Sequence, residues 1–77
     1  MSESVAEYIQ GLRTDAVLRL ERASRVGDRT QIACLRTAVN DLDGMTAALE
    51  LGLKDVALAH YGRARAAYED ATREQQP

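Results

Sequence analysis

The chain has 77 residues, a formal net charge of −2, no Phe or Trp, and three Tyr. A chain this short is near the lower size limit for a domain with one core, so we treat residues 1–77 as a single small helical domain. The core must be built mainly from Leu, Ile, Val and Ala, which bury little area each. The monomer is therefore expected to be weakly stable, which favours a homo-oligomer. The charge provides no general attraction to nucleic acid or anionic lipid.

The sequence also bears on the compartment. No apolar run approaches the ~20 residues that span a bilayer, and residues 1–10 lack a basic segment followed by an apolar one. The single cysteine, Cys34, cannot form a disulfide within the chain, which is typical of a reducing compartment. We expect a cytoplasmic protein without membrane association. Nine Arg against one Lys, with thirteen Ala, are typical of a GC-rich genome such as that of a bacterium or phage.

The first predicted element is a helix over residues 4–26. Ser4 and Glu7 have the spacing of a capping box, and Gly27 is a typical helix stop. Apolar residues recur every three or four positions, which at about 100° per residue places them in one stripe about 120° wide. This stripe comprises Val5, Ile9, Leu12, Ala16, Leu20 and Ala23, together with Tyr8 and Val26.

Two further helices are predicted over residues 29–51 and 54–74. Asp28 with Gln31 can cap the first of them, and Gly52 breaks the pattern between them. The stripe of the first is Ile32, Leu35, Val39, Leu42, Thr46 and Leu49, widened by Ala38 and Met45; that of the second is Leu53, Ala57, Tyr61, Ala64, Tyr68 and Ala71. Residues 75–77 are expected to fray. The short connections predict an all-α antiparallel three-helix bundle. The alternative is an elongated helical hairpin completed by dimerisation.

The segment Val39–Glu50 partly matches an EF-hand loop. With Gly44 at loop position 6, Asp41, Asp43 and Glu50 occupy positions 3, 5 and 12, but position 1 is Val39, which has no side-chain oxygen. The apolar stripe also continues through the segment without a change of phase. We therefore interpret it as helix with a solvated acidic patch and predict no metal site.

Cys34 and His60 are candidates for a nucleophile and a base, because they belong to different predicted helices. No third residue that would orient the base and no glycine-rich oxyanion turn can be identified. We therefore expect Cys34 to pack as a small apolar group and His60 to lie at the edge of a buried face. The sequence predicts no catalytic residue and no cofactor.

Three glycines fall inside predicted helices, at Gly11, Gly44 and Gly62, where each costs about 1 kcal/mol relative to Ala. Either they are tolerated on solvated faces, or they allow another helix to approach closely. Leu18 lies on the Gly11 side of its helix, and Leu58 lies one turn before Gly62. These leucines are candidates for secondary apolar seams that contact a partner or a second copy.

A basic ridge is formed by Arg19, Arg22 and Arg25, extended by Arg13 and Arg29. Between residues 13 and 29 these five Arg stand against Asp15, Glu21 and Asp28. The ridge could bind phosphates or an acidic protein surface. The interleaved acids and the missing aromatic residues favour a solvated helix flank that is stabilised by salt bridges.

Gly52 precedes the third predicted helix, and Ala57, Tyr61 and Ala64 follow this glycine by five, nine and twelve residues. Residues 52–64 thereby resemble the second half of a tetratricopeptide repeat. The resemblance implies a closely packed helical hairpin of the kind that this family uses to bind proteins. The chain departs from the family pattern upstream, at Asp41, Gly44, Met45 and Ala48, and at Glu69, where the family has Pro.

These features predict a non-catalytic protein-interaction module, a small oligomeric adaptor or modulator that presents a helical surface to a protein partner. The partner-binding residues are predicted to be Arg19, Arg22, Arg25, Leu18 and Leu58. The alternative is a regulator that binds nucleic acid through the Arg ridge of the first helix.

Overall fold

The computed structural model describes residues 4–73, which form three helices joined by two short connections. Helix α1 spans Val5–Val26, α2 spans Arg29–Glu50 and α3 spans Lys54–Arg73. No strand occurs among residues 4–73. The predicted all-α three-helix bundle is confirmed, and each helix boundary among these residues lies within one position of the prediction. The expected helix end at residue 74 and the tail 75–77 lie outside the described residues.

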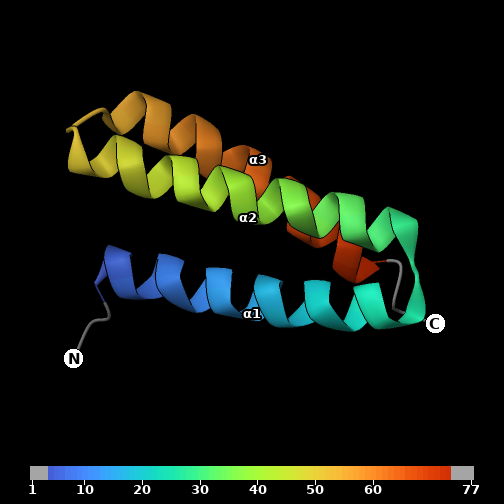
Figure 1. The fold of residues 1–77 in the computed structure, drawn as a ribbon. Coiled ribbons are helices and arrows are strands. Elements are labelled where there is room, and N and C mark those ends of the chain that lie inside the picture. The colour runs from blue at the N-terminus through green and yellow to red at the C-terminus, as the bar shows by residue number, and fades with distance from the viewer. Residues whose placement is uncertain (1–3, 74–77) are drawn as a thin grey trace.

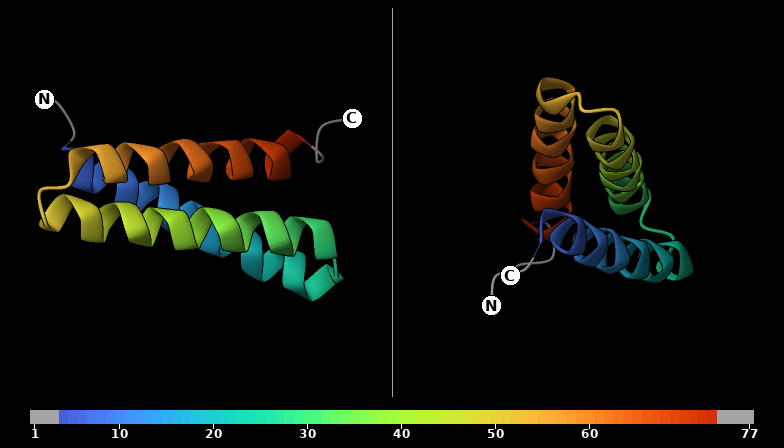
Figure 2. Two further views of the ribbon diagram at one scale, coloured as in Figure 1. Left: turned by 90° about the horizontal axis from the view of Figure 1, so that it is seen from above. Right: turned by 90° about the vertical axis from the view of Figure 1, so that its left-hand side faces the viewer.

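The helices run up, down and up, so that α1 and α3 point in the same direction and α2 is antiparallel to both (Figure 1). Viewed towards the end at which α2 passes into α3, the three helices occupy the corners of a triangle (Figure 2). Helix α2 packs most extensively against α3 and less extensively against α1, whereas α1 and α3 approach each other only weakly. One side of the triangle is therefore less closed than the other two.

Local signals in the sequence account for the helix boundaries. The Ser4 side chain accepts a hydrogen bond from the Glu7 backbone N–H at 3.1 Å. The Asp28 side chain accepts one from the Gln31 N–H at 3.1 Å. Gly27 adopts a left-handed conformation, with φ 73°, that most other residues would disfavour. Each of these contacts satisfies backbone groups left unpaired at a helix end, so the boundaries are determined locally.

The core is built largely from alanine. Its buried apolar residues are Ile9, Ala16, Ala23, Leu35, Ala38, Leu42, Met45, Ala48, Ala57, Ala64 and Ala71. Helix α3 contributes only alanines to this set, spaced seven residues apart, so every second turn presents the same small side chain to its neighbours. Because alanine has no side chain beyond Cβ, the helices can approach closely, but each contact buries little apolar area.

The buried face of α2 differs from the prediction. Thr46 is exposed and Leu49 is 39% exposed, whereas Ala48 and Gln31 are buried. Because α1 and α3 both pack against α2, its buried surface is centred between the two neighbours and not on the predicted stripe. At the ends of the bundle Val5, Val26 and Leu53 are also exposed. The predicted stripes therefore extend further than the neighbouring helices cover them.

Candidate functional site

A groove of about 260 Å³ lies between α1 and α3, on the open side of the bundle. Its lining includes Leu12 of α1, Leu42 of α2 and Ala64 of α3, together with all three tyrosines of the chain, Tyr8, Tyr61 and Tyr68. The spacing predicts the tyrosines in the buried stripes, yet Tyr8 is 44% exposed and the other two are half-buried. Tyrosine combines a large apolar ring with a polar tip, so it is suited to a surface that is partly wet.

Two pairs of residues cross the groove in a constant register. The hydroxyl oxygens of Tyr8 and Tyr61 are 3.4 Å apart, and their ring centroids are 6.5 Å apart. Two turns further along, the Tyr68 hydroxyl donates a hydrogen bond to the Asp15 carboxylate. Both pairs join residues that are 53 positions apart in the sequence. Helices α1 and α3 are therefore connected in parallel by tyrosine side chains, and their backbones stay apart.

Arg19 belongs to the same polar group. Its Nε is 2.8 Å from the Asp15 carboxylate, and its guanidinium carbon lies 5.5 Å from the centre of the Tyr68 ring. The Tyr68 and Arg19 hydrogen bonds hold the pKa of Asp15 below its usual value. Burial and the neighbouring Asp15 carboxylate raise the pKa of Tyr68. At neutral pH the group therefore contains a carboxylate, a guanidinium cation and a neutral phenol.

The two walls of the groove repeat with the spacing of a coiled coil. Alternate steps of three and four residues along α1 include Tyr8, Leu12, Asp15 and Arg19, and the same steps along α3 include Leu58, Tyr61, Arg65, Tyr68 and Thr72. The apolar positions lie towards the start of each helix. Further along, Arg65 pairs with Glu69 at 3.2 Å, and Arg19 pairs with Asp15. A second, shallower hollow shares Tyr8, Leu12 and Tyr68 and extends the groove past Gly11. The groove thus combines an apolar half with a polar half whose charges are already paired.

The residues of the predicted Arg ridge differ in their ion-pair partners. Arg19 faces the groove and is paired with Asp15, whereas Arg13 bonds Asp43 of α2 at 2.6 Å. Arg22 and Arg25 are exposed, and among residues 4–73 neither makes an ion pair within 4.0 Å. Of the three ridge residues, Arg22 and Arg25 therefore remain exposed cations, while Arg19 is paired at the edge of the groove.

The two predicted apolar seams lie on different surfaces. Leu58 is 65% exposed and lies two turns before Arg65 on the groove side of α3. Leu18 is 55% exposed and lies nine residues after the buried Ile9, which places it on the opposite side of α1 from the core. Leu58 therefore lies on the groove side of α3, beyond the residues that line the groove, whereas Leu18 belongs to the outer face of α1.

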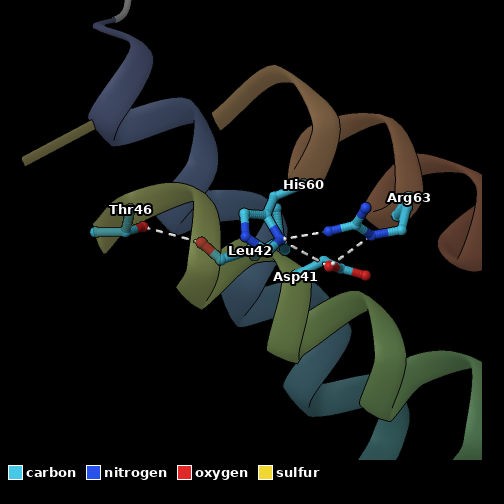
Figure 3. A network of polar contacts seen from close by, with 5 residues as sticks. All are labelled: Asp41, Leu42, Thr46, His60 and Arg63. Carbon is cyan, nitrogen blue, oxygen red and sulfur yellow. Dashed lines mark hydrogen bonds and ion pairs between the residues drawn. The ribbon is translucent and has the colours of Figure 1, made fainter. Parts of the chain in front are cut away.

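A polar cluster crosses the seam between α2 and α3 (Figure 3). His60 Nδ1 lies 2.9 Å from Asp41 Oδ1, and Arg63 Nε lies 3.2 Å from the same oxygen. Arg63 Nη2 is also 3.0 Å from His60 Nδ1. His60 Nδ1 cannot both donate a hydrogen bond to Asp41 and accept one from Arg63. We assign the proton to His60 Nδ1, because the carboxylate is the stronger acceptor. Burial by itself would raise the pKa of Asp41, but the hydrogen bonds from His60 and Arg63 outweigh it and lower the pKa.

Two acidic residues of the EF-hand-like segment, Asp41 and Asp43, make ion pairs with neighbouring helices. Helix α2 continues unbroken through the segment, as its apolar spacing predicts. The predicted solvated patch is wrong for Asp41, whose side chain is only 13% exposed and bonds α3. Asp43 is solvated as predicted, with 53% of its side chain exposed, and it also bonds Arg13 of α1. Among residues 4–73 no group of three or more His, Cys, Asp or Glu is arranged to hold a metal ion.

Cys34 and His60 are not brought together. Cys34 packs with Leu20 and Tyr68 against the cluster of Ala23, Leu35 and Ala71. His60 contacts Asp41, which lies two turns further along α2, about 10 Å along the helix axis. The predicted interpretations of Cys34 as a packing residue and of His60 as a residue at the edge of a buried face agree with these positions.

Among the described residues no helix is both long and apolar enough to cross a membrane. In comparisons with family models, curated proteins and solved structures, no match to this chain is found.

Proposed function

We propose that the chain is a non-catalytic protein-interaction module that binds an amphipathic helix of a partner protein in the groove between α1 and α3. In this proposal it acts as a small oligomeric adaptor, and its copies associate through a surface outside the groove. The observation that carries the proposal is the groove itself, which is lined by every tyrosine of the chain and by the apolar residues Leu12 and Leu42.

The distribution of apolar side chains supports this proposal. Only four buried residues of the described chain are larger apolar residues than alanine: Ile9, Leu35, Leu42 and Met45. Among residues 4–73 nine large apolar residues are exposed, including Tyr8 in the groove and Leu58 beside it. Since exposed apolar area on a small monomer is generally limited, this distribution favours a surface that is covered by another molecule.

The shape of the groove favours a helix as the occupant. The parallel walls of α1 and α3 leave the position that a fourth helix occupies in a four-helix bundle. A partner helix with apolar residues at steps of three and four would contact Tyr8 and Leu12 on one wall and Leu58 and Tyr61 on the other. In the polar half of the groove, Arg19 and Arg65 are already paired within the chain. We therefore expect the partner to contribute mainly apolar contacts in that half as well.

The tyrosines provide a direct assay. The chain has no Trp, so its intrinsic fluorescence comes from three tyrosines that all line the groove. Candidate partners would be captured from the native host, and their amphipathic segments would be synthesised without Tyr or Trp. Titration with a segment that binds the groove should change the tyrosine fluorescence and shift the NMR amide signals of residues 8–19 and 58–72.

A matched pair of variants tests the location. Leu58→Glu places a charge beside the apolar half of the groove, and we expect it to weaken binding by about tenfold or more. Leu51→Glu is the control, because Leu51 is 74% exposed at the connection between α2 and α3, away from the groove. If Leu58→Glu leaves the affinity unchanged, or if the amide shifts map elsewhere, the groove is not the binding site.

A further inference from the structure

The outer face of α1 contains two features that the isolated bundle does not explain. Gly11 lies inside the helix, where it costs about 1 kcal/mol relative to Ala, yet a Cβ at this position would meet no atom within 4 Å. Leu18 is 55% exposed on the same face, two helical turns away. A position without a side chain and an exposed apolar side chain therefore lie along one line of the helix.

Charged residues continue this line in both directions. Glu7 lies one turn before Gly11, and Arg22 lies one turn after Leu18. Both are exposed, and among residues 4–73 neither side chain makes an ion pair within 4.0 Å. Arg22 lies near enough to Asp15 to contribute to its lowered pKa, but it remains at the surface. The outer face of α1 thus carries an acidic group at its start and a basic group towards its end.

We propose that two copies of the chain associate antiparallel through this outer face, with Leu18 of each copy packed against Gly11 of the other. A two-fold axis between Thr14 and Asp15 places Leu18 opposite Gly11. The same axis places Glu7 opposite Arg22. The face is therefore self-complementary both in shape and in charge, as an isologous contact between identical subunits requires. The absence of a side chain at Gly11 lets the two helices approach closely, and Leu18 loses its exposure to water.

The dimer contact lies beside the groove, and of its named residues only Gly11 also lines the shallower hollow that extends the groove. Leu18 lies on the side of α1 away from the core, and the groove itself is lined by neither Gly11 nor Leu18. Each copy in the dimer therefore keeps this groove available. The proposed dimer does not depend on the proposed partner helix. A groove variant such as Leu58→Glu should therefore leave the monomer–dimer equilibrium unchanged.

Sedimentation equilibrium from about 10 µM to about 1 mM, a range that covers weak to moderate dissociation constants, tests the dimer. We expect a monomer–dimer equilibrium in the wild type. Arg22→Glu places like charges opposite each other and should weaken the dimer by about tenfold, and Glu7→Arg combined with Arg22→Glu should restore it. Leu18→Ser should also weaken it, whereas Leu58→Ser is the matched control. The helical circular-dichroism spectrum and the urea midpoint establish that each variant folds.

Cross-linking tests the register. In a Cys34→Ser background, Thr14→Cys places two thiols beside the two-fold axis, so oxidation should give a disulfide-linked dimer. Glu7→Cys is the control, because its two copies would be more than 20 Å apart along the helix axis at about 1.5 Å per residue. A wild type that stays monomeric up to about 1 mM would overturn the proposal. So would a dimer that is insensitive to Arg22→Glu and Leu18→Ser, or one that cross-links through Glu7→Cys and not through Thr14→Cys.

Discussion

The imidazole ring of His60 lies directly over Gly44, at a distance that leaves no room for a side chain on α2. A Cβ atom at Gly44 would be 2.7 Å from His60 Cε1 and 2.8 Å from Nε2. Of the two interpretations of the helical glycines, close approach applies here. At Gly11 and Gly62 no such neighbour occurs among the described residues. The glycine thus allows His60 to reach Asp41 across the seam between α2 and α3.

Gly44→Ala should destabilise the protein by about 1–2 kcal/mol, because the methyl group displaces His60 from Asp41 and this cost exceeds the gain in helix propensity. Gly62→Ala is the control and should stabilise α3 by about 0.5–1 kcal/mol, since the added methyl group meets open space. Urea denaturation followed by circular dichroism measures both. In a His60→Ala background the cost of Gly44→Ala should disappear; a cost that persists there would show that His60 is not its cause.

Gln31 is the one buried polar residue of the described chain, and its side-chain amide donates a hydrogen bond to the Ala71 carbonyl near the end of α3. Gln31→Leu leaves that carbonyl without this donor and should destabilise the protein by about 1–3 kcal/mol. Gln10→Leu, at an exposed position of α1, should change the stability by less than about 0.5 kcal/mol. Equal effects of the two substitutions in thermal denaturation would contradict the assigned role of Gln31.

The stability should fall in acid. The pKa values of Asp15 and Asp41 are lowered in the folded state relative to an unfolded value of about 3.9. Their contributions are therefore complete above about pH 4 and are lost as the pH falls through the lower folded-state values. The stability difference between the wild type and Asp15→Asn should be constant near neutral pH and should shrink below about pH 4.

NMR titration of the carboxyl carbons checks the cause of this shift. Tyr68→Phe removes the hydrogen bond that contributes most to the lowered pKa of Asp15, so this pKa should rise in the variant. For the stability comparison with Asp15→Asn, the control is Asp70→Asn, because Asp70 belongs to an exposed pair with Arg73 at 3.7 Å that contributes little to stability. An Asp15 pKa that does not change in Tyr68→Phe would contradict the assigned hydrogen bond.

Nucleic-acid binding through the Arg ridge should be weak or undetectable. Arg19 is paired with Asp15, Arg13 with Asp43, and Arg22 and Arg25 remain as exposed cations on the outer part of α1. Fluorescence anisotropy of labelled duplex and single-stranded DNA at about 50 mM salt should show no saturable binding. Binding that weakens with salt and is lost in Arg22→Glu would instead support the regulator.

The helices and their ends could be predicted because their signals are local. Ser4, Gly27 and Asp28 act on backbone groups within four residues of themselves, so a reading of the sequence finds them. Which side of α2 is most deeply buried depends on two neighbouring helices at once. This explains why Thr46 was predicted in the stripe but is exposed, and why Gln31 is buried.

The candidate sites were less predictable, because they depend on pairings between distant residues. Spacing alone shows that Tyr8 and Tyr61 share a helical face with apolar residues, but it cannot show that they meet across a groove from positions 53 residues apart. The same limit applies to Asp41, whose partners His60 and Arg63 lie on another helix. The exposure of Leu18 and Leu58 was predictable, since both lie outside the main stripes of their helices. The resemblance of residues 52–64 to the second half of a tetratricopeptide repeat stays a prediction.

Helices α2 and α3 form the tightly packed part of the molecule, while a groove crossed by tyrosine side chains separates α1 from α3. Native-state hydrogen exchange, measured residue by residue in Arg22→Glu at low protein concentration, tests this arrangement most directly. We predict that the amides of α1 exchange through openings of lower free energy than those in the middle of α2 and α3. Equal protection of all three helices would contradict the claim, because α1 would then be packed as firmly as the other two.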